Sequence, residues 1–172
     1  AKLYAENEEK AERSKAFDGV LDLLMPRWME FVATRSGHEA YPDANSTMRV
    51  NYGAVSGYAP RDAVWYKPFT TLQGVIEKNT GVFPFNCPAR LIDAATRQTH
   101  GPYSAKPLGD VPVDFLTTND STNGNSGSPI LNARGELVGC LFDGNYEAVS
   151  GDFAFDGKIQ RSISVDIRYV LW

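Results

Sequence analysis

The chain has 172 residues, of which 42% are hydrophobic and 22% charged, as expected for one ordinary globular domain. Its 17 basic and 21 acidic side chains give a formal net charge of −4, which argues against nucleic acid or an anionic membrane as a partner. No stretch reaches the ~18 consecutive apolar residues of a membrane span. Fifteen glycines and ten prolines indicate many turns and therefore a largely β protein.

The first 35 residues predict a helical segment. Ala, Glu, Lys, Arg and Leu dominate it, and apolar residues from Phe17 to Met25 recur at helical spacing. Pro26 is expected to break or kink this helix. The segment has neither an initiator Met nor the basic start and apolar core of a signal peptide, so we expect the chain to be a piece of a larger protein.

The middle of the chain predicts short elements separated by loops. Residues 48–54 alternate between apolar and other side chains, which is typical of a half-buried strand. Residues 70–80 predict a short helix or a turn, and residues 90–98 predict a second short helix, entered after Pro88. Residues 113–118 are a strand candidate.

The last third contains the clearest local signal, a β-hairpin. Residues 129–131 and 136–142 are apolar runs that flank a turn ending in Gly135, a residue that suits a positive φ angle. Residues 159–165 predict another strand. Short strands after a helical lead predict an antiparallel barrel or a sandwich fragment.

A serine-containing loop precedes the hairpin directly. Residues 123–129, Asn-Gly-Asn-Ser-Gly-Ser-Pro, match the Gly-x-Ser-Gly-Gly/Ser-Pro pattern of trypsin-like serine peptidases. A nucleophilic serine must project from a tight turn, and neighbouring glycines let the backbone aim N–H groups at an oxyanion. Ser126 is therefore the candidate nucleophile, and the amides of Gly124 and Ser126 are the candidate oxyanion donors. A plain solvent loop has the same composition, but the hairpin that follows favours the peptidase interpretation.

A catalytic triad also needs a general base and an acid that orients it. His38 and His100 are the two histidines of the chain, and both lie in Gly- or Pro-containing loops without an apolar strand before them. We expect both to be ordinary loop residues and the base to lie outside this chain. Their spacing forms no metal motif, so no metal or other cofactor is expected.

Several separated segments, taken together in chain order, closely resemble the C-terminal part of bacterial dipeptidyl peptidases 7 and 11. They are residues 41–50, 57–63, 68–74, 124–129 and 165–172. The resemblance covers essentially the whole chain. It implies a metal-independent serine exopeptidase that releases dipeptides from peptides with a free N-terminus, in the periplasm or at the outer surface of a Gram-negative bacterium.

The same resemblance implies a domain organisation. Residues 1–40 would be the tail of an inserted helical domain, and residues 41–172 the second antiparallel β-barrel of a two-barrel trypsin-like catalytic domain. The partners would be the first barrel and the helical domain of the parent chain. The triad His and Asp of the family belong to that first barrel, so this chain alone is expected to be inactive or nearly so.

Carried over by position, the resemblance also implies site residues. The nucleophile falls on Ser126 and an oxyanion donor on Gly124. Asp143 matches an aspartate that helps bind the α-amine of the substrate, as suits a carboxylate facing a cation. Gly144 matches the position that sorts specificity for P1, the residue before the cleaved bond: members with Arg there prefer acidic P1 residues and members with Gly prefer bulky apolar ones. We therefore expect an apolar or aromatic P1 residue.

Asp120 offers a competing interpretation. It lies six residues before Ser126, the offset of the acidic pocket residue of trypsin, which would predict cleavage after Lys or Arg. The alternative is that Asp120 orders the turn at residues 117–120 by bonding to nearby backbone. The resembling family carries an acid here in members of differing P1 preference, which weakens the trypsin analogy.

Other residues leave smaller alternatives open. Cys87 and Cys140 either pair in an oxidising compartment or stay free, and their settings favour free thiols. Tyr146 and Phe153, in the loop after Gly144, are candidates for lining the substrate pocket.

Two other functions compete with the exopeptidase. One is half of an endopeptidase of the trypsin or glutamyl-endopeptidase type, and the other is a peptide-binding barrel without catalysis. Asp143 and Gly144 favour the exopeptidase, whereas the missing base leaves the binding alternative open. An apolar surface meant for the first barrel is also able to drive formation of a homodimer.

Overall fold

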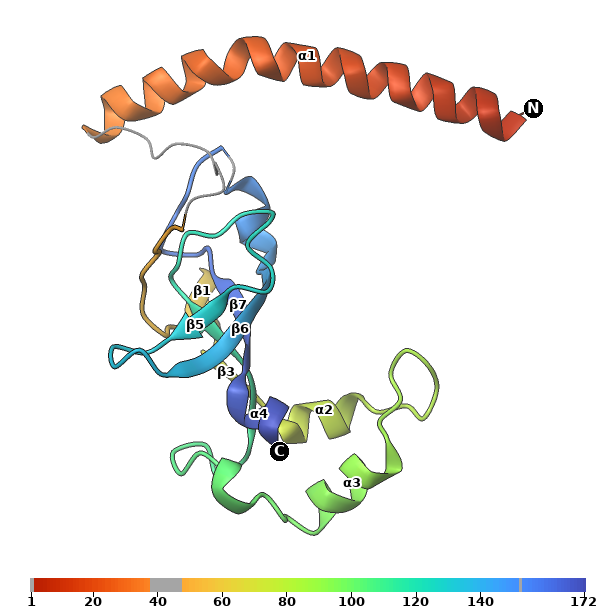
Figure 1. Cartoon of the computed structure of the whole chain (residues 1–172), viewed down its shortest axis with the longest axis vertical. Helices are drawn as coiled ribbons and strands as arrows, with labels where there is room; N and C mark the ends of the chain where they lie inside the picture. Colours follow the sequence, from red (N-terminus) through yellow and green to blue (C-terminus); the bar gives the residue numbers. More distant parts are fainter. Residues whose placement is uncertain (1, 38–47, 152) are drawn as a thin grey trace. The chain divides into compact units, whose positions relative to one another are not determined.

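The computed structural model describes residues 2–37, 48–151 and 153–172, and the chain divides into two units, residues 1–49 and 50–172. Helix α1 (Lys2–Ser36) makes up most of the first unit and runs through Pro26 without a break (Figure 1). The helix therefore does not break at Pro26, because the loss of one backbone hydrogen bond does not end so long a helix, and the kink expected there as the alternative stays a prediction. No helix in the described ranges is long and apolar enough to cross a bilayer.

The second unit contains two antiparallel sheets. One pairs β1 (Tyr58–Arg61) with β2 (Val64–Tyr66). The other has the strand order β3-β4-β7-β6-β5, with bounds Phe69–Thr71, Pro112–Thr117, Ser162–Asp166, Leu137–Gly144 and Pro129–Leu131. All of its neighbours pair in antiparallel register, as the sequence predicted.

The sheets do not close into the barrel that the sequence predicted. The two edge strands of the larger sheet, β3 and β5, have three residues each and do not pair with each other in the described part of the chain. The predicted strand at residues 48–54 is wrong as well, because these residues form no strand, and the nearest pairing is an isolated bridge between Val55 and Thr117. The expected mainly β content is also wrong, since α1 alone contributes 35 residues.

Short helices cover one end of the larger sheet. Helices α2 (Leu72–Lys78) and α3 (Ala89–Thr96) confirm the two predicted ones, and α4 (Ile167–Leu171) follows β7 directly. A 3₁₀ turn, η1, spans Gly101–Tyr103. These helices pack on a core formed by Leu72, Val111 and Val113, to which Trp172 adds its side chain.

The predicted hairpin is confirmed and fixes the edge of the sheet. Asn132 closes its turn, because the side-chain oxygen accepts from the amides of Arg134 and Glu136 at 2.9 and 3.1 Å. Gly135 has a φ of 77°, a conformation that favours glycine. Pro129 lies opposite Cys140 in the resulting register. The hairpin therefore places the loop before β5 beside the end of β6.

Candidate active site

Two backbone bonds extend the hairpin pairing into the serine loop. The Gly127 amide donates to the Leu141 carbonyl at 2.7 Å, and the Leu141 amide donates to the Ser128 carbonyl at 2.9 Å. Gly124 and Gly127 have φ angles of 89° and 88°, which let the chain turn sharply before it joins the sheet. The two glycines explain this turn, because residues with a Cβ rarely adopt such φ angles.

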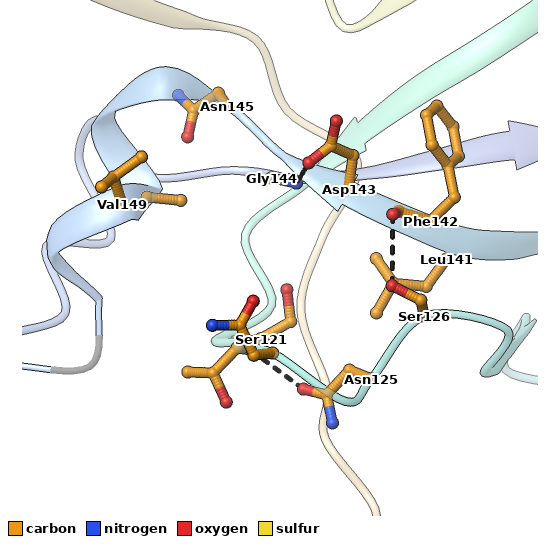
Figure 2. A pocket seen from close by; sticks show the side chains of 12 residues that line it. Ser121, Asn125, Ser126, Leu141, Phe142, Asp143, Gly144, Asn145 and Val149 are labelled. Carbon is orange, nitrogen blue, oxygen red and sulfur yellow. Dashed lines mark hydrogen bonds between the residues drawn. The ribbon is translucent and has the colours of Figure 1, made fainter. Parts of the chain in front are cut away.

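Ser126 lies exposed on this loop, and its Oγ donates to the Phe142 carbonyl at 3.3 Å (Figure 2). The backbone amides of Gly124 and Ser126 donate no hydrogen bond to any residue that the structure describes. Two neighbouring N–H groups without an internal acceptor are available to an external oxygen.

A cavity of about 240 Å³ opens next to Ser126 (Figure 2). It is lined by residues of the 121–126 loop and of the 141–149 segment. Asp143 is the single charged side chain among the described residues that line it, and its Oδ1 accepts from the Gly144 amide at 2.8 Å. The sequence-predicted residues Ser126, Asp143 and Gly144 therefore border one cavity.

The far wall of the cavity comes from η2 (Tyr146–Ser150), a 3₁₀ segment that follows β6. Ala148 and Val149 line the cavity, whereas Tyr146 and Phe153 do not. The expectation that Tyr146 and Phe153 line it is therefore wrong for this cavity. Both are aromatic and stand out in a sequence, but Ala148 and the 77% exposed Val149 are the η2 side chains that border this open cavity.

Asn145 holds η2 to the segment of the same chain that precedes β7. It is 7% exposed, and its side-chain oxygen accepts from the Arg161 amide at 2.8 Å while its Nδ2 donates to the Ile159 carbonyl at 2.7 Å. Its backbone amide also donates to the Arg161 carbonyl at 2.9 Å. The Tyr58 hydroxyl adds a bond to Glu147 Oε2 at 3.0 Å.

Gln160 and Arg161 complete a buried polar network behind this wall. Gln160 Nε2 donates to the Glu147 carbonyl at 3.0 Å and to Ser150 Oγ at 3.1 Å. The Arg161 guanidinium lies over the ring of Tyr58, and among the described residues it donates only to backbone carbonyls. Its burial lowers the pKa of the group. These residues were not among the sequence-predicted candidates; the available signal was a Gln-Arg pair inside the segment 159–165 that was predicted to be a strand.

His100 is not brought to Ser126 in the described part of the chain. His100 lines a second cavity of about 160 Å³ that shares no lining residue with the first. Its Nε2 lies 3.9 Å from Asp110 Oδ1, and the ring meets Trp172 edge-on. His38 lies outside the described residues, so the expectation for it stays open.

The remaining candidates occupy other places. The backbone carbonyl of Asp120 accepts from the Asn51 side chain, and the cavity lining begins one residue later at Ser121. Cys87 and Cys140 are free and half-buried, as expected. Within the described ranges, no group of three His, Cys, Asp or Glu side chains is arranged to hold a metal ion.

The whole chain, residues 1–172, matches the family described as Peptidase S46, so it belongs to that family of peptidases. It is 41% identical over 194 residues to the Asp/Glu-specific dipeptidyl-peptidase of Shewanella putrefaciens, covering 99% of this chain and 26% of that protein. It is 54% identical over 132 residues to dipeptidyl-peptidase 7 of Phocaeicola vulgatus, covering 76% of this chain and 18% of that protein.

A solved structure is similar over nearly the same span. The crystal structure of Porphyromonas endodontalis DPP11 in complex with the dipeptide Arg-Asp matches with a TM-score of 0.77 and 39% identity. The match covers 97% of this chain and 24% of that one. The chain thus spans about a quarter of the length of the Shewanella enzyme and of the DPP11 chain, the two relatives whose matches cover nearly all of it.

Proposed function

We propose that this chain supplies the nucleophile and the substrate pocket of a serine dipeptidyl peptidase. The observation that carries the proposal is the exposed Ser126 hydroxyl beside a cavity, on a loop whose Gly124 and Ser126 amides have no acceptor among the described residues. Membership of the peptidase S46 family supports it. The general base and its orienting acid then come from parts of the whole protein outside this chain.

In this proposal the chemistry follows the acyl-enzyme route. Ser126 Oγ attacks the scissile carbonyl while its proton passes to the base, and the amides of Gly124 and Ser126 stabilise the oxyanion. The bond to the remaining peptide breaks, and the base returns its proton to the leaving amine. Water then releases the N-terminal dipeptide from Ser126.

Asp143 is proposed to bind the free α-amine of the substrate. Its carboxylate lies at the cavity, where it provides a negative partner for an ammonium group. An anchored amine limits how many residues fit between it and Ser126. This limit favours release of a short N-terminal peptide over internal cleavage.

The pocket is proposed to accept apolar or aromatic P1 side chains. Its described lining contains Leu141, Ala148 and Val149 and no Lys or Arg. An acidic P1 side chain would therefore find no positive partner there, and the carboxylate of Asp143 would repel it. The names of the relatives do not decide this point, because both an Asp/Glu-specific enzyme and a dipeptidyl-peptidase 7 are similar to this chain.

The periplasm or the outer cell surface is proposed as the place of action, and this proposal rests on the sequence resemblance.

The test uses the full-length protein that carries this chain. We expect Ser126→Ala to abolish labelling by a fluorophosphonate probe and to lower kcat on a dipeptide reporter with apolar P1 on the order of a millionfold. Ser128→Ala, two residues along the same loop, serves as the matched control and retains labelling. Labelling that survives in Ser126→Ala contradicts the proposal.

Substrate blocking separates the competing functions. A peptide with an acetylated N-terminus is expected to be a poor substrate, because Asp143 then has no ammonium group to bind. Efficient cleavage of the blocked peptide at an internal bond favours the endopeptidase alternative. Peptide binding by a full-length protein that neither labels nor cleaves favours the binding-module alternative.

A further inference from the structure

The dipeptide Asn123-Gly124 lies in the serine loop with both residues exposed. Within the ranges that the structure describes, the Asn123 carboxamide takes part in no hydrogen bond and the Gly124 amide donates none. We propose that Asn123 is a site of spontaneous deamidation, with the Gly124 nitrogen as the internal nucleophile. The effect on activity that we derive below rests on the proposed function, whereas the modification itself does not.

The reaction needs nothing but water. The Gly124 nitrogen attacks Cγ of Asn123 and loses its proton to solvent, and ammonia leaves to give a five-membered succinimide. Water then opens one of the two ring C–N bonds, which produces either aspartate or isoaspartate at position 123. Glycine favours ring closure because no Cβ shields its nitrogen, and the space around Gly124 is open for 4 Å where a Cβ would stand.

Other asparagines nearby are restrained, which makes the proposal specific. The Asn125 side-chain oxygen accepts from the Thr122 amide at 3.0 Å, so its carboxamide is held in the loop. The Asn132 carboxamide accepts two turn amides and donates to Glu136. Ser126 and Ala133, the residues after these two asparagines, also carry a Cβ. Asn123 has neither restraint.

Both products alter the proposed oxyanion site. Aspartate adds a negative charge one residue before the Gly124 amide and disfavours a developing oxyanion. Isoaspartate inserts a carbon into the main chain, which shifts that amide relative to Ser126. Loss of one oxyanion donor costs roughly a hundredfold to a thousandfold in kcat. Ageing of the protein is therefore expected to inactivate it while the fold persists.

The experiment incubates the full-length protein in warm, mildly alkaline buffer and samples it over time. Peptide mapping with fragmentation mass spectrometry measures the modified fraction separately at positions 123, 125 and 132. We expect position 123 to be modified first and activity to fall in proportion to that fraction. Equal or slower modification at 123 than at 125 and 132 overturns the proposal.

Asn123→Gln is the matched variant, because a glutamine must close a less favourable six-membered ring. Its activity, normalised to its own starting value, is expected to outlast that of the unaltered protein. Decay at the same rate in both proteins overturns the link between Asn123 and activity. Modification at 123 in a protein that never shows peptidase activity contradicts the proposed function but supports the modification site.

Discussion

Gly144 lies at the end of β6, opposite η2 in the lining of the candidate substrate pocket. A Cβ added here would stand 3.1 Å from the Ala148 Cβ, closer than ordinary van der Waals contact. Because Ala148 belongs to a wall held by a polar network, it has little freedom to move away. The absence of a side chain at Gly144 therefore sets the width of the candidate pocket and adds no charge beside Asp143.

Substituting this glycine is predicted to affect substrate size selection. In the full-length protein, Gly144→Ala is expected to raise KM for substrates with a bulky apolar P1 residue while changing kcat with a small P1 residue little. A second substitution, Ala148→Gly, is expected to restore the original KM by relieving the contact. Steady-state kinetics with a series of P1 residues measures both effects.

Gly74→Ala is the control for this prediction. Gly74 lies in α2, outside the candidate pocket, and no atom lies within 4 Å of an added Cβ there. It should leave the P1 series unchanged. An equal loss on small and bulky P1 residues in Gly144→Ala would instead show that the substitution disturbs the chemistry or the fold.

At the scale of elements, the structure joins η2 to the residues before β7. Asn145 bonds to both backbone groups of Arg161 and to Ile159, and Gln160 reaches back to η2. These groups are buried, so each loses its hydration in the folded state and depends on its internal partners. The network explains how a segment with few buried apolar side chains keeps one conformation.

Asn145→Ala is predicted to loosen η2. It leaves the Arg161 amide and the Ile159 carbonyl without their side-chain partner, at a cost of about 1–3 kcal/mol for each buried group left unsatisfied. Hydrogen exchange of the full-length protein, followed by mass spectrometry, is expected to show faster exchange over residues 145–150. The variant should also discriminate less between bulky and small P1 residues.

Tyr146→Ala is the matched control, because Tyr146 lies in the same element and is 89% exposed. Its hydrogen exchange over residues 145–150 should stay close to that of the unaltered protein. Unchanged exchange in Asn145→Ala would show that the backbone bonds alone hold η2 in place.

At the scale of the whole molecule, large apolar side chains are exposed in both units. Phe17 of α1 is 63% exposed, and Trp65 and Phe83 of the second unit are 63% and 86% exposed. Such side chains are typical of surfaces that are covered by a partner. We propose that other parts of the full-length protein cover them, in keeping with a chain that spans about a quarter of its relatives.

The isolated chain is therefore predicted to self-associate and to lack activity. Analytical ultracentrifugation should show a mass that rises with concentration, and a fluorophosphonate probe should leave Ser126 unlabelled because no base activates it. The full-length protein, tested beside it, should be labelled. Labelling of the isolated chain would show that the base lies within it, which would return attention to His38 and His100.

Local patterns explain most of what could be predicted from the sequence. The hairpin after residue 128, the glycine-rich turn around Ser126 and the two short helices depend on neighbouring residues and their backbone preferences. Ser126 could be proposed from its own glycine-rich motif, whereas Asp143 and Gly144 were implied as site residues by the family resemblance. Their meeting at one cavity follows from the register of β5 and β6.

The sequence by itself thus determined the local elements, the candidate nucleophile and the family resemblance. Only the tertiary structure decided that the sheet stays open, that Ala148 and Val149 face the cavity, and that Asn145 and Arg161 hold this wall. The physical reason is the distance along the sequence between the residues that interact. A turn is set by the φ angles of adjacent residues, whereas sheet closure and the burial of a polar side chain depend on partners far along the chain, which no local pattern specifies.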